Sequence, residues 1–147
     1  MSPKKADNKH KLAIACSPCP NDIYIFYALM NKKISTYLDF NFKILPIHQL
    51  NNLSKNYLFD LVKVSVPLYF FLKKYYSILP VGTAIQSRQG PKLISKIDCF
   101  DDIKETSSII SPGKNTTAET VTKILFGCSN FYHCSYKDVF SILDKKN

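Results

Sequence analysis

Three short segments carry small polar side chains where an apolar, strand-like run gives way to a helix-like pattern. They span residues 17–22, 65–67 and 112–118, and their polar members include Ser17, Asn21, Asp22, Ser65, Asn115, Thr116 and Thr117. In an open parallel sheet such turns lie at the carboxyl ends of the strands, where free N–H groups and the helix dipole favour anions. The pattern therefore predicts a site for a small carboxylate, with ordinary helix capping as the alternative interpretation of any single turn.

The elements that position these turns alternate between strand and helix over the first 80 residues. Residues 12–16 form a continuous apolar run, typical of a strand buried on both faces. A helix is predicted from the spacing of Ile23, Phe26, Tyr27 and Met30, with Asn21 or Asp22 as its cap. Further strands are predicted at residues 40–45, 61–64 and 76–81, and further helices at 49–56 and 67–75. This alternation predicts a parallel α/β sheet.

The second half of the chain opens with a polar crossing segment, residues 82–91, which contains both glycine and proline. Beyond it we predict strands at 93–97, 108–111 and 131–135, a helical turn at 100–105, and helices at 115–126 and 136–143. The chain is thus expected to comprise a flexible leader (1–10), a first α/β lobe (11–84), an inter-lobe crossing (85–96) and a partial second α/β lobe (97–147).

The motifs at these turns resemble those of the 1,4-dihydroxy-6-naphthoate synthase family, which acts in the futalosine route to menaquinone. The motifs are Ser-Pro-Cys-Pro-Asn-Asp at 17–22 with Ile-Tyr-Ile-Phe-Tyr-Ala after it, Asp-Leu-Val-Lys-Val-Ser at 60–65, the crossing at 82–91, and Pro-Gly-Lys-Asn-Thr-Thr-Ala at 112–118. They follow the family's order at near-family spacing, so the resemblance covers residues 11–147. It implies a type II periplasmic-binding-protein-like fold of two α/β lobes, the first nearly complete and the second truncated.

The resemblance also implies a substrate and the residues that bind it. The family is a lyase that converts cyclic dehypoxanthine futalosine, a small carboxylate-bearing molecule, to 1,4-dihydroxy-6-naphthoate; we expect no metal and no cofactor. By position, the substrate-binding residues would be Lys63, Val64 and Ser65 in the first lobe, Thr117 and Ala118 in the second, and Ser17, Asn21 and Asp22 at the cleft floor. The N–H groups of Thr117 and Ala118, at a helix start, suit the substrate carboxylate.

The family's catalytic base is expected to lie outside this sequence. That base is a His within an Ile-His-Glu motif; its spacing from the 112–118 turn places it beyond Asn147, and no such motif occurs here. We therefore expect an N-terminal part that is inactive alone, either a fragment or one half of a split enzyme with a separate C-terminal half. His133 is expected to be a partly buried strand residue, and His10 and His48 to be leader and surface residues. The rival hypothesis is a non-catalytic module that binds a small carboxylate.

Composition narrows the classes of partner. The formal net charge is +9, from 20 Lys+Arg against 11 Asp+Glu, but the lysines are scattered and Arg88 is the one arginine. Bidentate recognition of bases or phosphates therefore lacks its usual side chain, and we expect no nucleic-acid partner. The longest apolar stretch, residues 64–72, is too short to span a bilayer, so we expect no membrane partner.

Five cysteines, Cys16, Cys19, Cys99, Cys128 and Cys134, give an odd number at irregular spacing. This usage indicates reduced thiols and a cytoplasmic protein rather than a secreted disulfide scaffold. Cys16 and Cys19 form a Cys-x-x-Cys pair between a strand and a helix, so a thiol redox protein is a second alternative. A zinc site drawn from Cys16, Cys19, Cys128, His133 and Cys134 is disfavoured because the second cluster lacks regular ligand spacing.

Overall fold

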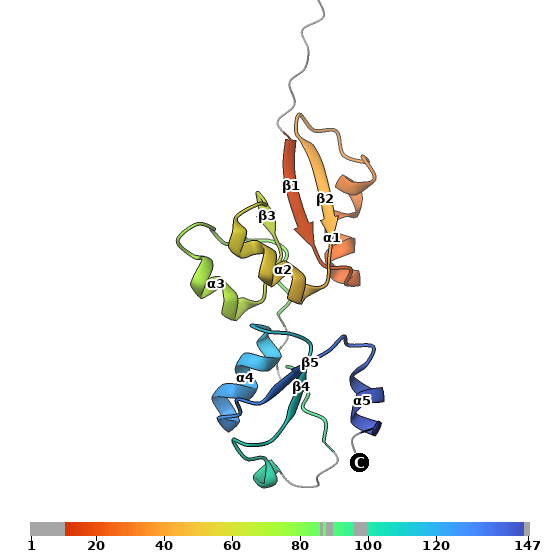
Figure 1. Ribbon diagram of the computed structural model, residues 1–147. Coiled ribbons are helices and arrows are strands. Elements are labelled where there is room, and N and C mark those ends of the chain that lie inside the picture. Colours follow the sequence, from red (N-terminus) through yellow and green to blue (C-terminus); the bar gives the residue numbers. More distant parts are fainter. Residues whose placement is uncertain (1–10, 86, 88–89, 96–99, 146–147) are drawn as a thin grey trace, which may run out of the picture.

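The computed structural model describes residues 11–85, 87, 90–95 and 100–145, which form two β-sheets flanked by helices (Figure 1). The first sheet has the order β2-β1-β3, where β1 spans Lys11–Cys16, β2 Asp39–Ile44 and β3 Leu61–Val62. The second sheet pairs β4 (Ile109–Ser111) with β5 (Phe131–His133). The pairings within both sheets are parallel. The fold is therefore mixed α/β with parallel sheets, as the alternating sequence pattern predicts.

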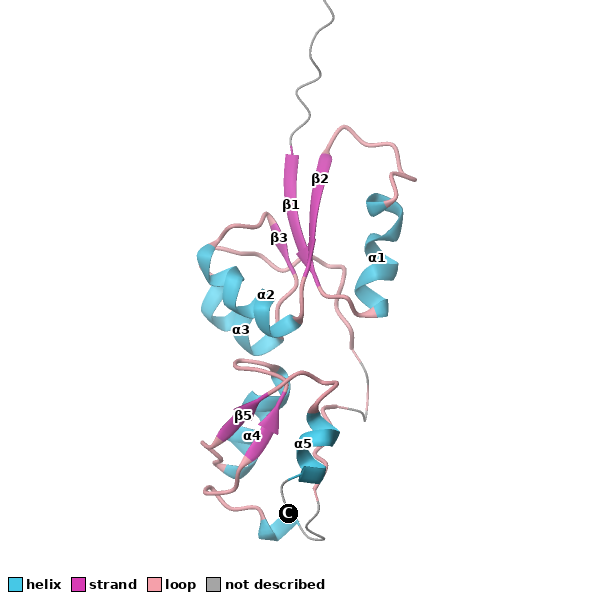
Figure 2. Cartoon of the chain, turned by 45° about the vertical axis from the view of Figure 1, so that its right-hand side comes forward, coloured by secondary structure: helices cyan, strands magenta, loops and turns pink. Residues whose placement is uncertain are grey.

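In the described chain, a helix follows each strand. They are α1 (Pro20–Met30), α2 (Ile47–Leu53), α3 (Val66–Leu72), α4 (Thr117–Phe126) and α5 (Val139–Lys145), with short 3-10 turns η1 (Ser54–Asn56) and η2 (Phe100–Asp102). Figure 2 shows α1 on one side of the first sheet and α2 and α3 on the other. Within the described part of the chain, no helix combines the length and apolar character needed to cross a bilayer.

The core of the first sheet lies between β1 and the helices α2 and α3. Its fully buried apolar side chains are Ile14, Ala15 and Cys16 from β1, Leu50 from α2, and Leu68 and Leu72 from α3. On the other side of the sheet, the ring of Phe26 in α1 meets that of Phe42 in β2 edge-on, with centroids 5.7 Å apart. Because helices cover both faces, the buried half of β1 is apolar without alternation.

The turn between β1 and α1 is built differently from the expected cap. Cys19 is the N-cap residue and makes no side-chain capping bond, while Pro20 opens the helix. Asp22, in the first turn, reaches back: its Oδ2 accepts the N–H of Ser17 at 3.1 Å and the hydroxyl of Ser17 at 2.6 Å. The prediction of Asn21 or Asp22 as cap was therefore wrong, because Asp22 fixes the turn from inside the helix.

The strand predicted at residues 76–81 is absent, and residues 93–95 form no strand either; residues 96 and 97 lie outside the described part of the chain. The N–H of Tyr76 instead donates to the carbonyl of Leu72 at the end of α3, and its hydroxyl donates to the carbonyl of Phe59 at 3.0 Å. An apolar run becomes a strand only where a neighbouring strand satisfies its backbone groups. The described strands offer no such neighbour to residues 76–81, so Ile78 and Leu79 remain exposed.

Candidate functional site

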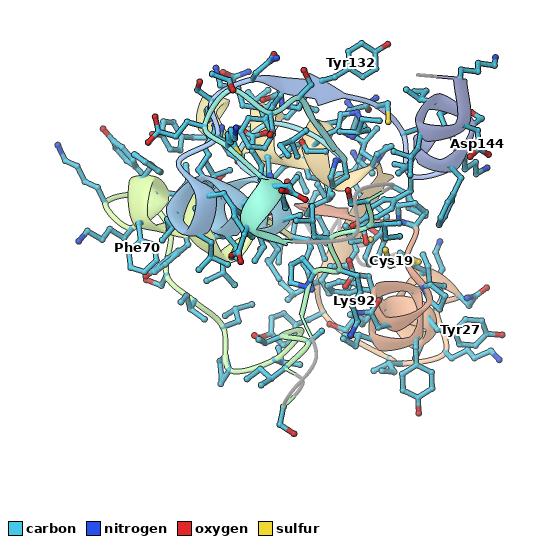
Figure 3. All side chains as sticks on the ribbon, turned by 90° about the horizontal axis from the view of Figure 1, so that it is seen from below. Cys19, Tyr27, Phe70, Lys92, Tyr132 and Asp144 are labelled. Atoms are coloured by element: carbon cyan, nitrogen blue, oxygen red, sulfur yellow. The ribbon has the colours of Figure 1, made fainter. Side chains whose placement is uncertain are left out.

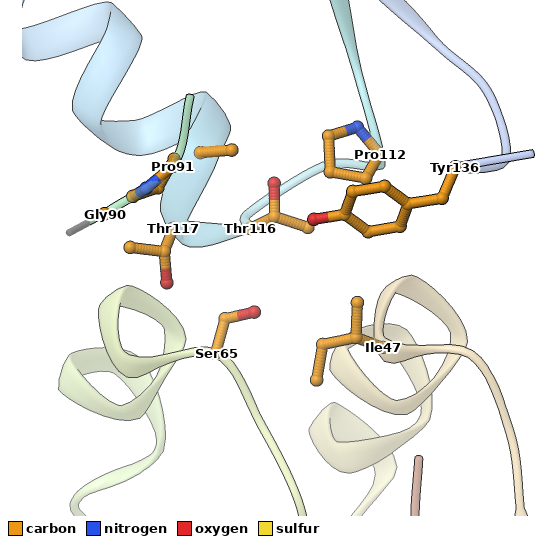
Figure 4. A pocket seen from close by; sticks show the side chains of 9 residues that line it. Ile47, Ser65, Gly90, Pro91, Pro112, Thr116, Thr117 and Tyr136 are labelled. Atoms are coloured by element: carbon orange, nitrogen blue, oxygen red, sulfur yellow. The ribbon is translucent and has the colours of Figure 1, made fainter. Parts of the chain in front are cut away.

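A cavity of about 390 Å³ opens between the two sheets, beside the carboxyl ends of their strands (Figure 4). On the side of the first sheet it is lined by Ile47 and Ser65, and the crossing segment adds Gly90 and Pro91. The lining residues on the side of the second sheet are Pro112, Thr116, Thr117, Ala118 and Tyr136. Ligands of open parallel sheets bind at this end of the strands. The volume falls within the range of small-molecule sites.

The cavity combines hydroxyl groups with apolar surfaces. Figure 4 shows the side chains of Ser65 and Thr117 on opposite walls, and the ring of Tyr136 beside Pro112 with its hydroxyl directed toward Thr116. Within the described part of the chain, the lining residues include no His, Cys, Asp, Glu, Lys or Arg side chain. This mixture suits a flat organic molecule with one anionic group better than it suits a highly charged ligand.

Asn51 of α2 fixes Ser65 and joins the two walls, although its side chain is fully buried. Its Oδ1 accepts the N–H of Ser65 at 3.0 Å, while its Nδ2 donates to Ser65 Oγ at 3.0 Å and to the carbonyl of Asn115 at 3.3 Å. Because Ser65 Oγ accepts from Asn51, the serine proton can be donated into the cavity. The sequence analysis did not identify Asn51 as a site residue, because an asparagine on a helix is usually exposed. Its position next to the apolar Leu50 was the one feature of the sequence that could have indicated its burial.

The wall at α4 is formed by the turn that follows β4. Thr116 caps the helix, because its Oγ1 accepts the N–H of Glu119 at 3.4 Å and donates to the carbonyl of Gly113 at 2.8 Å. Helix geometry leaves the N–H groups of Thr117 and Ala118 without intrahelical partners. These two groups lie at the positive end of the helix dipole, where an anion is stabilised.

Gly113 lets the two walls approach closely. Its φ of 147° is one that side chains rarely adopt, and an added Cβ atom would collide with the Cβ atom of His48 in α2. His48, expected at the surface, is therefore partly buried against the turn of the second sheet. The glycine in the 112–118 motif thus serves the contact between the sheets as well as the turn itself.

Three residues expected to bind substrate form a network outside the cavity lining. The carboxylate of Asp22, which is 2% exposed, accepts from Ser17 and pairs with Lys63 Nζ at 3.1 Å. Lys63 Nζ also donates to the carbonyl of Gly82 at 2.7 Å, at the start of the crossing segment. The network therefore ties the β1–α1 turn to the end of β3 and to the crossing.

The expected site residues are thus divided by the structure. Ser65, Thr117 and Ala118 line one cavity, whereas Ser17, Asp22, Lys63, Val64 and Asn21 are not among its lining residues. Asn21 is exposed and Val64 is half-buried. Substrate binding by any of these residues stays a prediction.

A buried glutamate lies behind the α4 wall. Glu119 is 2% exposed, pairs with Lys123 one turn further along α4, and has its Oε2 2.7 Å from Nε2 of His133. Burial desolvates the carboxyl of Glu119 and raises its pKa, but hydrogen bonds from Lys123 and His133 outweigh this and hold the pKa below its ordinary value. The strand expected around His133 is confirmed, yet the ring is more exposed than predicted, at 40% of the side chain.

The Cys-x-x-Cys pair does not have the electrostatics of a redox site. Cys16 is fully buried, and burial, followed by the charge of Asp22, raises the pKa of its thiol. Catalytic thiols of this motif have lowered pKa values and accessible sulfur atoms, so the thiol redox alternative is disfavoured. Among the described residues, no three His, Cys, Asp or Glu side chains are grouped as metal ligands.

Known proteins resemble this chain along most of its length. A family model described as menaquinone biosynthesis matches residues 12–142. The 1,4-dihydroxy-6-naphthoate synthase of Thermus thermophilus is 27% identical over 109 residues, which is 73% of this chain and 39% of that protein. The enzyme of the same name from Streptomyces coelicolor is 31% identical over 87 residues, 58% of this chain and 30% of that protein.

The fold also matches a solved structure. A crystal structure of a protein from Archaeoglobus fulgidus superposes with a TM-score of 0.82 at 24% identity, covering 92% of this chain and 50% of that one. The chain therefore spans half or less of the length of each of these proteins. Since the family model covers most of the sequence, the chain belongs to the menaquinone biosynthesis family.

Proposed function

We propose that this chain supplies part of the substrate site of a futalosine-route lyase, which converts cyclic dehypoxanthine futalosine to 1,4-dihydroxy-6-naphthoate. Membership of the menaquinone biosynthesis family supports the pathway, and two relatives bear the name of this enzyme. Because the chain spans only part of those relatives, the activity is proposed for the whole enzyme, which we place in the cytoplasm. The chain's own part is to hold the carboxylate end of the substrate.

The observation that carries this proposal is the shared cavity of Ser65 and the start of α4. Two N–H groups, of Thr117 and Ala118, and one hydroxyl, of Ser65, come from turns that follow strands of different sheets. In the proposal, these three donors meet one anion in the cavity that their residues line, at the start of a ten-residue helix. A carboxylate there would accept these hydrogen bonds without the desolvation that a buried counter-charge requires.

The remaining lining fits the rest of the substrate. Ile47, Pro91 and the ring of Tyr136 offer flat apolar surfaces against which an aromatic ring can pack. Lys63 and Asp22 take a supporting part, because their ion pair fixes the end of β3 two residues before Ser65. In the proposal, Val64 contributes its backbone between Lys63 and Ser65, while Ser17 and Asn21 shape the floor through the β1–α1 turn.

The proton-abstracting base is proposed to come from a further part of the enzyme. The lining residues provide hydroxyls and N–H groups, and neither is a base at neutral pH. We propose a two-lobe, type II periplasmic-binding-protein-like fold in which a C-terminal half, in the same protein or as a separate partner, brings the family His to this cavity. The solved Archaeoglobus structure, half of which this chain covers, supports a fold larger than the part described here.

The binding step can be tested by removing a single N–H group. Thr117→Pro deletes the first donor of α4 at a position where proline is tolerated, and Thr116 already has the extended backbone (φ −74°, ψ 158°) that must precede a proline. Titration calorimetry with 2-naphthoate should show Thr117→Pro binding roughly tenfold more weakly, and Thr117→Ala binding much closer to the unaltered chain. Naphthalene-2-carboxamide, which lacks the charge, is the matched ligand control. Equal affinity of the proline and alanine variants would refute the role assigned to the helix start.

The catalytic step needs a separate assay. The chain incubated alone with cyclic dehypoxanthine futalosine should release no naphthoate, whereas addition of the C-terminal part of the Thermus thermophilus relative should restore release. Binding of 2-naphthoate without turnover in either mixture would favour the non-catalytic carboxylate-binding module. The observation that favours this second candidate is that the described lining residues include no His, Cys, Asp, Glu, Lys or Arg side chain.

A further inference from the structure

The carboxylate of Glu119 lies behind the α4 wall rather than in the cavity. It is almost fully buried, faces the second sheet, and has partners on three elements: Ser111 at the end of β4, Lys123 on α4 and His133 on β5. Lys123 is held on this side of the helix, since its Nζ also sits 4.9 Å from the ring centre of Phe131. A buried carboxylate with this many partners on separate elements fixes their relative positions.

Two hydrogen-bonded paths lead from Glu119 to the same residue, Gly113, in the turn that forms the cavity wall. Through the side chain, Glu119 Oε2 accepts from Ser111 Oγ at 3.4 Å, and Ser111 Oγ accepts the N–H of Gly113 at 3.3 Å. Through the backbone, the N–H of Glu119 donates to Thr116 Oγ1, which donates to the carbonyl of Gly113. Both backbone polar groups of Gly113, its N–H and its carbonyl, are therefore hydrogen-bonded within this network.

Two neighbouring side chains offset the negative charge of Glu119, which lies close to the proposed anion site. An isolated carboxylate in the first turn of α4 would repel an anion bound at the N–H groups of Thr117 and Ala118. Lys123 pairs with Glu119, and His133 lies within hydrogen-bond distance of it, so the negative charge of Glu119 is offset beside the helix start. Replacing the carboxylate by a neutral amide of the same shape should therefore change anion affinity little.

We propose that Glu119 is a positioning residue of the carboxylate site: by way of Ser111 it holds Gly113, and so the Pro112–Ala118 turn, in the conformation that presents N–H donors to the cavity. This inference rests on the proposed function, because it concerns the same site. Glu119 does not touch the ligand in this arrangement, and its effect on binding is transmitted through Ser111 and the turn.

The test measures 2-naphthoate affinity of the full chain by titration calorimetry, with the folded fraction checked by circular dichroism. Glu119→Ala and Ser111→Ala should each weaken binding about fivefold to tenfold, and the double variant should be no weaker than the weaker single, because both break one path. Glu119→Gln, which can still accept from Ser111, should bind within about twofold of the unaltered chain. Matched controls are Glu105→Gln, an exposed glutamate, and Ser141→Ala, a serine of α5 whose hydroxyl donates to the carbonyl of Asp138.

The outcomes separate the two proposals. If the unaltered chain fails to bind 2-naphthoate, the proposed function fails at this site and the inference falls with it. If the chain binds but the folded Ser111→Ala variant keeps full affinity, the positioning role is refuted while the proposed function stands. Should Glu119→Ala not fold, the Ser111→Ala and Glu119→Gln results still decide the matter, since full affinity in Ser111→Ala, or a roughly fivefold to tenfold loss in Glu119→Gln, would refute the positioning role.

Discussion

Asn51 provides the sharpest test of how the cavity is assembled. Its buried amide makes two hydrogen bonds to Ser65 and one to the carbonyl of Asn115, so it is the one side chain seen to bond both walls among the described residues. Asn51→Ala removes all three bonds and leaves the N–H of Ser65 without its acceptor. Ser65→Ala removes one bond and leaves the other two in place.

The expected losses follow from these numbers of bonds. A typical hydrogen bond contributes about 1 kcal/mol net to folding, so Asn51→Ala should lower the free energy of unfolding by about 3 kcal/mol and Ser65→Ala by about 1 kcal/mol. A domain of ordinary stability has about 5–15 kcal/mol in total, so the larger loss is readily measured. Asn52→Ala is the matched control, because Asn52 is an exposed asparagine on the same helix and gains the same helix propensity.

Urea unfolding followed by circular dichroism measures these differences, provided that the m-value stays constant across the series. Amide hydrogen exchange gives a local check, since the N–H of Ser65 should exchange faster in Asn51→Ala and unchanged in Asn52→Ala. The reasoning is refuted if Asn51→Ala loses no more stability than Asn52→Ala, or if its loss equals that of Ser65→Ala.

Three further predictions address other parts of the chain. Gly113→Ala should cost about 2–3 kcal/mol in urea unfolding, because the alanine must adopt a φ of 147° and displace His48; a loss below 1 kcal/mol would contradict the close approach. The pKa of Glu119 is lowered in the folded state, so its contribution to stability is fully present above the ordinary glutamate pKa of about 4.3 and is lost as the pH falls through the lowered pKa. Measurements of the free energy of unfolding at decreasing pH should show this loss, and the Glu119→Gln variant should not show it. Maleimide should label exposed Cys19 at least about tenfold faster than buried Cys16, with the difference abolished in urea; equal rates in the folded chain would contradict the burial of Cys16.

The turns of the site could be predicted because each turn is specified by residues that are neighbours in the sequence. A buried apolar run followed by small polar residues and a helical pattern identifies the carboxyl end of a parallel strand, and such ends lie along one edge of a sheet. That reasoning led to Ser65 and to Thr117, which the structure brings to one cavity. The helix beginning at Thr117 was predictable for the same reason, since Thr116 is a strong capping residue.

The partners of buried polar residues could not be predicted from residue type. Lys63 and Asp22 have the chemistry of ligand-binding groups, yet in the structure each is paired with the other, and Lys63 also holds Gly82. Asn51, which has the chemistry of a surface helix residue, is buried between the walls. A sequence gives the number of donors and acceptors but leaves open which of them meet, because that depends on contacts far apart along the chain.

The same distinction explains why the apolar run at residues 76–81 was misassigned. Its composition satisfies the requirement for a strand, but a strand also needs a neighbour, and β3 pairs with β1 over only two residues. Periodicity reports how a segment would bury its side chains and says nothing of whether a partner strand exists.

In the described chain, the contacts that join the walls of the cavity include the bond from Asn51 to Asn115, the approach of Gly113 to His48, and the packing of α3 beside α4. Contacts of this kind amount to a few kcal/mol, so the arrangement of the two sheets is held by an energy comparable to that of a bound ligand. A carboxylate that bridges Ser65 and Thr117 would bind only the arrangement in which both face the same cavity. Binding and the docking of the two sheets must then be thermodynamically linked, so that each residue that joins the walls also sets the affinity of the site.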